Sequence, residues 1–110
     1  MEDLAINIKY GTPISNIHSD GNIYLNCNVS NARKPLYFRL KHGTVGANLS
    51  FKDNIDRIKQ VYLEDVIVNG FLVVPHYTNV ILKGNSTNVK VAIYRSENYP
   101  EQDDGKIIIL

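Results

Sequence analysis

Apolar and polar residues alternate with a period of two in several stretches of the chain. The alternation is clearest from Gly21 to Val29. One face of that stretch carries Ile23, Leu25, Cys27 and Val29, and the other carries Asn22, Tyr24, Asn26 and Asn28. Successive side chains of a β-strand point to opposite sides of the sheet, so this pattern predicts half-buried strands.

The same reasoning, with turn residues as boundaries, predicts strands over 4–10, 22–29, 36–41, 45–51, 61–68, 71–74, 77–82, 88–95 and 106–110. Asn69-Gly70 lies between two apolar runs and favours a β-hairpin. The connection 11–21 is expected to be a long loop or to hold a short irregular strand. Residues 52–60 are the one helical candidate, because Ile55 and Ile58 are spaced for a single helical turn.

Eight to nine short strands with at most one helical turn predict an all-β domain. We expect a single two-sheet β-sandwich over residues 1–110, of the immunoglobulin-like or jelly-roll type. The sequence shows no internal repeat.

Charge and composition narrow the function. The net charge is +1 and the basic residues are scattered, which argues against a nucleic-acid partner. The acidic N-terminus lacks a signal-peptide pattern, and no apolar run is long enough to span a membrane. The chain holds 13 Asn, 13 Ile and only 4 Arg. Asn and Ile are encoded by A/T-rich codons, so this composition suggests an A/T-rich genome, such as those of many bacteria and the phages that infect them. We therefore expect a virion location if the protein is viral and a cytoplasmic one otherwise.

No motif for catalysis, cofactor binding or metal binding stands out. His18, His42 and His76 lie in separate segments without ligand spacing, so a metal-dependent β-sandwich enzyme is only a rival hypothesis. Cys27 shares the inward face of its strand and is expected to be inert. The acidic stretch 101–105 is expected to be a solvated turn rather than a calcium loop.

Tyrosine and asparagine are frequent on the predicted outward faces. Tyr24, Tyr37 and Tyr94 lie outward on their strands, together with Arg39. Tyr and Arg are enriched at protein–protein contacts, whereas Tyr and Asn together can form a platform for a glycan. Tyrosine also has a high intrinsic strand propensity, which by itself would explain the pattern.

The C-terminal run is apolar without alternation. Ile107, Ile108, Ile109 and Leu110 follow Lys106 with no polar residue between them. Such a strand is normally covered on both faces, and would promote aggregation if left exposed. It is therefore expected to be a central strand or to be covered by a neighbouring subunit.

Together these observations favour a non-enzymatic structural protein that works by assembly with other protein subunits, its own copies included. A bacteriophage virion component is the preferred class: a capsid decoration protein, or a fibre or baseplate subunit. The predicted contact residues are Tyr24, Tyr37, Arg39, Tyr94, Ile107, Ile108, Ile109 and Leu110. The alternative is a carbohydrate-binding module that uses the Tyr/Asn face.

Overall fold

The computed structural model describes residues 3–8, 13–27, 35–53 and 55–110. These residues form strands and two short 3₁₀ helices, η1 and η2. In chain order the elements are β1 (Leu4–Asn7), β2 (Ile14–Ser19), β3 (Ile23–Asn26), β4 (Leu36–Val45), β5 (Leu49–Lys52), η1 (Ile55–Arg57), β6 (Ile58–Val68), β7 (Phe71–Pro75), β8 (Asn79–Lys83), η2 (Gly84–Asn88), β9 (Lys90–Tyr94) and β10 (Ile107–Ile109). No helix among the described residues is long and apolar enough to cross a membrane.

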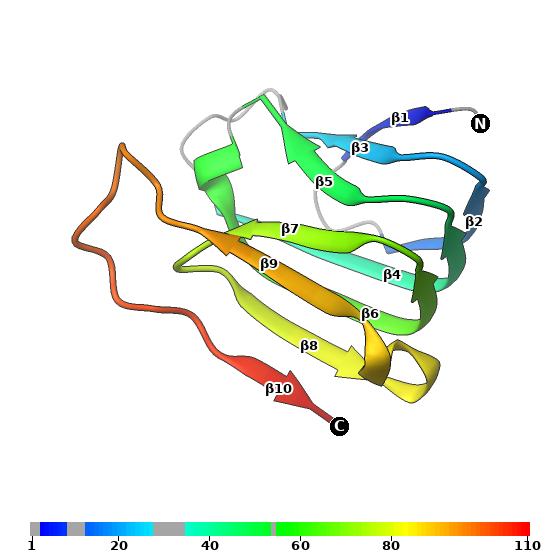
Figure 1. The fold of residues 1–110 in the computed structure, drawn as a ribbon. Coiled ribbons are helices and arrows are strands. Elements are labelled where there is room, and N and C mark those ends of the chain that lie inside the picture. The colour runs from blue at the N-terminus through cyan, green and yellow to red at the C-terminus, as the bar shows by residue number, and fades with distance from the viewer. Residues whose placement is uncertain (1–2, 9–12, 28–34, 54) are drawn as a thin grey trace.

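The strands alternate between two sheets. One five-stranded sheet has the order β1-β3-β5-β7-β9, and the other has the order β10-β8-β6-β4-β2. Every pair is parallel. Each odd strand and the even strand that follows it therefore make one coil, and the coils stack into a parallel β-solenoid of about 4 turns (Figure 1).

The predicted immunoglobulin-like or jelly-roll sandwich is therefore wrong, although the all-β class is confirmed. Those sandwiches are built from antiparallel strands, whereas here each strand pairs with the strand two places along the chain. The alternation of apolar and polar residues indicates which side chains of a strand face inward, but it does not indicate which other strand pairs with that strand or in which direction.

Two local predictions agree with the structure. The connection 11–21 contains a short strand, β2, and the helical candidate 52–60 contains a single 3₁₀ turn, η1, before β6 begins. The predicted hairpin is wrong. Asn69-Gly70 is not a hairpin, because β6 and β7 belong to different sheets and the chain turns a corner of the coil there. Glycine suits that corner since a Cβ at Gly70 would lie 2.7 Å from the carbonyl oxygen of Ala47 on the preceding coil.

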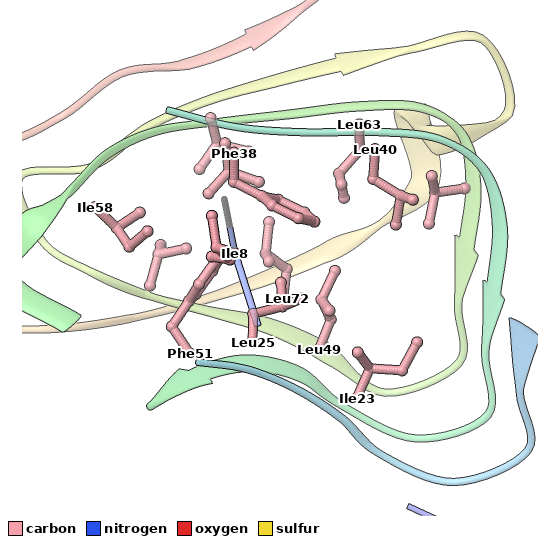
Figure 2. Close-up of a cluster of buried hydrophobic side chains, with 14 of the residues drawn as sticks. Ile8, Ile23, Leu25, Phe38, Leu40, Leu49, Phe51, Ile58, Leu63 and Leu72 are labelled. Atoms are coloured by element: carbon pink, nitrogen blue, oxygen red, sulfur yellow. The ribbon is translucent and has the colours of Figure 1, made fainter. Parts of the chain in front are cut away.

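The core is a set of apolar columns that run along the stack. Leu40, Leu63 and Leu82 are register partners on successive coils, and each is at most 1% exposed. Ile23, Leu49 and Leu72 form the facing column in the other sheet. Figure 2 shows Leu40 and Leu63 on one side of the interior and Ile23, Leu49 and Leu72 on the other. Each inner coil thus buries its inward face because another coil lies on either side of it.

A second column sets the shape of the coil. Asn16, His42, Asp65 and Gly84 have positive φ angles of 57°, 58°, 56° and 63°. Each directly follows a residue of one register row: Ser15, Lys41, Glu64 and Lys83. Asn, Asp, His and Gly are the residues that adopt the left-handed region most readily. The same bend therefore recurs at the same point of four successive coils.

A ladder of side-chain hydrogen bonds joins the coils where the chain enters the odd-strand sheet. The amide N–H of Asn22 donates to Asp3 Oδ1, that of Asn48 to Asn22 Oδ1, and that of Phe71 to Asn48 Oδ1, each at 2.9 Å. Asp and Asn at this position therefore satisfy a backbone donor of the next coil.

The ladder also exposes an internal repeat that the sequence inspection missed. Asn22-Ile-Tyr-Leu-Asn and Asn48-Leu-Ser-Phe-Lys align residue by residue, and they are β3 and β5 with the residue before each. The prediction of no internal repeat is wrong for this pair of coils.

Candidate functional site

The last coil carries an unusual group of exposed aliphatic side chains. It consists of β9, β10 and the connecting segment 95–106. Ile93 is 56% exposed, Ile109 is 61% exposed and Leu110 is 65% exposed, and Ile107 and Ile108 are also exposed. These five residues, which we call the terminal aliphatic row, are half of the exposed large hydrophobic residues in the described part of the chain.

The position of the row in the stack explains its exposure. Ile109 is the register partner of Leu82 and so continues the buried column of Leu40 and Leu63. Ile93 is likewise the partner of the buried Val74. Both side chains point inward, but β9 and β10 are the last strands of their sheets among the described elements. They continue the buried columns, and no further coil among the described residues covers them.

The C-terminal run is therefore an edge strand, not a central one. Of the two arrangements expected for Ile107–Leu110, the structure excludes the first within this chain. Cover by a neighbouring subunit remains a prediction, as does the contact role of the individual residues.

A buried histidine fastens the segment that leads to β10. His76 is 5% exposed, and its Nδ1 accepts the Ser96 amide N–H at 3.1 Å. The ring proton therefore resides on Nε2, which donates to the carbonyl oxygen of Gln102 at 3.1 Å. The backbone of His76 also accepts the Gly105 N–H at 2.8 Å. These hydrogen bonds hold the segment 96–105 against His76, and so fix the position at which β10 begins.

The four other predicted contact residues do not share one surface. Tyr24 and Tyr94 lie in the odd-strand sheet, on β3 and β9, with two strands between them. Tyr37 and Arg39 lie on β4, on the outward face of the other sheet. Tyr37 is 64% exposed, and the Arg39 guanidinium lies 4.6 Å from the ring centre of Tyr62. The residues proposed for a glycan platform are thus split between two sheets.

Register brings together a charged cluster that sequence inspection did not detect. The Tyr62 hydroxyl donates to Glu64 Oε1 at 2.6 Å, and the Nζ atoms of Lys41 and Lys83 lie 3.5 and 4.0 Å from the same carboxylate. The Tyr62 hydrogen bond lowers the pKa of Glu64, and the two lysines lower it further. The same bond raises the pKa of Tyr62. The cluster crosses β4, β6 and β8 and ties three coils together.

The three histidines do not meet. His18 Nδ1 lies 2.8 Å from Thr44 Oγ1, His42 lies 3.9 Å from an Asp65 carboxylate oxygen, and His76 is occupied as described above. In the described residues, no three His, Cys, Asp or Glu side chains gather where a metal ion could bind. The rival hypothesis of a metal-dependent enzyme therefore loses its proposed ligand set.

Cys27 lies in the core with its side chain fully buried. Burial raises the pKa of its thiol to about 12, although the nearby Arg57 opposes the rise. The reactive thiolate is therefore disfavoured near neutral pH. Its position agrees with the inward face predicted from alternation.

A shallow groove lies at a corner of the first coils and is lined by His18, Ser19, Asp20, Thr44 and Ile67, among others. It is open to solvent and its imidazole is bonded to Thr44. The terminal aliphatic row is therefore the stronger candidate for a functional surface. No family model matches the chain, and neither a curated protein nor a solved structure does.

Proposed function

We propose that this protein is a non-catalytic structural subunit that joins other protein subunits through its last coil. The observation that carries the proposal is the terminal aliphatic row, in which Ile93, Ile107 and Ile109 are register partners of buried residues and yet are exposed at the end of the stack. A solenoid needs a polar cap or a neighbour at its end to remain soluble. Here the end is aliphatic, which favours a neighbour.

The mode of contact follows from the secondary structure. β9 and β10 end their sheets, so each offers one side of its backbone to a further strand. A strand added there forms main-chain hydrogen bonds while its side chains cover Ile93, Ile107 and Ile109. Each Å² of apolar surface that is removed from water contributes about 25 cal/mol. This mechanism requires no cofactor.

The setting we propose is a bacteriophage virion, on the grounds of small size, A/T-biased composition and an assembly surface. Among virion components, a fibre or baseplate subunit suits the fold better than a decoration protein. Stacked coils extend a structure along one axis, which is the geometry that a fibre requires.

The test is the absolute mass of the purified protein by light scattering across micromolar concentrations. We expect the wild type to form oligomers and Ile109→Lys to be monomeric, because the ammonium group would be placed where a partner packs. Ile67→Lys is the matched control, since Ile67 is 51% exposed but lies on β6, away from the last coil. A wild type that stays monomeric and soluble at millimolar concentration would contradict the proposal.

A further inference from the structure

We propose that the partner at the last coil is the first coil of a second copy, so that molecules stack head to tail. This inference rests on the proposed assembly function and specifies its partner and geometry. It follows from a comparison of the first coil, which contains β1 and β2, with the last coil, which contains β9 and β10. These two coils lie at opposite ends of the stack (Figure 1).

The apolar columns match from end to end. In the odd-strand sheet one column runs from Leu4 through Ile23, Leu49 and Leu72 to Val91. In the even-strand sheet another runs from Ile14 through Leu40, Leu63 and Leu82 to Ile109. A first coil placed on a last coil would therefore set Leu4 over Val91 and Ile14 over Ile109. Aliphatic side chains would meet aliphatic side chains, as they do inside the molecule.

The first coil has surface to offer to such a contact. Leu4 is 38% exposed although it belongs to an inward column, and Ile6 and Ile14 are only partly buried. β1 and β2 end their sheets at that side of the stack. In a head-to-tail contact β1 would pair with β9 and β2 with β10, both parallel, which is the pairing that each coil already makes with the next.

Charge supports the same register. Asp3 directly precedes Leu4, and Lys90 directly precedes Val91, so the head-to-tail arrangement makes Asp3 and Lys90 neighbours on adjacent strands. Both residues are exposed in the single molecule. Adjacent strands lie about 4.8 Å apart, which brings the carboxylate and the ammonium group within reach of each other.

The alternative is a closed dimer in which two last coils face each other. That contact would pair the strands antiparallel and leave the first coil uncovered. The head-to-tail contact instead joins two different surfaces, so it repeats along one axis and produces filaments. The two geometries make opposite predictions for a change in the first coil.

The experiment compares the solution masses of Leu4→Lys, Ile109→Lys and their equimolar mixture with that of the wild type. Each variant keeps one intact end, so each alone should be monomeric and the mixture should form a 1:1 dimer. A mixture that stays monomeric would overturn the inference. So would a Leu4→Lys variant that assembles like the wild type, an outcome that indicates the closed dimer and leaves the proposed function intact. A wild type that never assembles would instead refute the proposed function itself.

A second variant keeps the inference testable if Leu4→Lys does not fold. The double variant Asp3→Cys, Lys90→Cys changes two exposed residues and removes one acceptor of the ladder, Asp3 Oδ1, which receives the Asn22 N–H. Strand spacing matches the Cα separation of a disulfide. Mild oxidation should give a ladder of linked multimers on a non-reducing gel. Linked dimers alone, or no links in a sample that has assembled, would overturn head-to-tail stacking. The buried Cys27 is not expected to interfere.

Discussion

A pair of alanine substitutions in one inward column tests whether the last coil is open. Leu63 and Ile109 occupy equivalent positions, in the middle and at the end of the same column. Leu63 is 0% exposed, whereas Ile109 is 61% exposed. The two side chains are isomers of the same size, so a difference between the variants reports mainly their surroundings.

The expected losses differ severalfold. Truncation of a fully buried leucine removes its apolar contacts and leaves a cavity, so Leu63→Ala should lower the free energy of unfolding by about 3–4 kcal/mol. For Ile109 most of the side chain already contacts water, and no enclosed cavity would form. Ile109→Ala should therefore cost about 1 kcal/mol in the monomer.

The assay is urea unfolding followed by circular dichroism, at a protein concentration low enough for the monomer to dominate. A similar m value in both variants would show that the unfolded states are comparable. At higher concentration the cost of Ile109→Ala should grow, because assembly stabilises the folded chain and the variant assembles poorly. Equal losses for the two variants in the dilute monomer would refute the open end.

Three further predictions concern the stacking contacts and the buried thiol. Asn48→Ala should lower the free energy of unfolding by about 1 kcal/mol, because the Phe71 N–H loses its acceptor, and Asn48→Asp should largely retain stability in the same urea assay. The pKa of Glu64 is lowered in the folded protein. Its contribution to the free energy of unfolding is therefore present above the unfolded-state pKa, near 4.5, and is lost as the pH falls through the folded-state pKa. Unfolding between pH 6 and pH 3 should therefore be less pH-dependent in Glu64→Gln, and an unchanged acid profile would contradict the role of the Tyr62 bond. Cys27 should react with a thiol reagent only after unfolding, and rapid labelling of the native protein would contradict its burial.

Much of the local structure could be predicted from the sequence. Ile23, Leu25 and Cys27 face inward as their alternation indicates, because side-chain direction along a strand depends only on position in that strand. The cover expected for Ile107–Leu110 stays a prediction, made because a run without alternation has no polar face to turn toward water. Both inferences use neighbours in sequence alone.

The topology could not be obtained in this way. Register partners such as Leu4 and Ile23 are 19 residues apart, and Ile23 and Leu49 are 26 apart, so the repeat has no fixed period to detect. The clearest clue was the Asp or Asn before β1, β3 and β5, whose ladder role becomes visible only when the coils are aligned. Alternation alone predicts that the Ile93 side chain faces inward, but it cannot predict that this side chain is exposed. Its exposure depends on its being in the last coil.

The strictly neighbour-to-neighbour stacking has a consequence for how the chain folds. No coil can bury its inward face alone, so the first stable nucleus should contain at least two coils. The β4–β6 pair is the natural starting point, because it has the longest register of matched residues in the described chain. Order would then spread outward in both directions, and β10, with three residues and one partner strand, would be the last element to form and the first to fray.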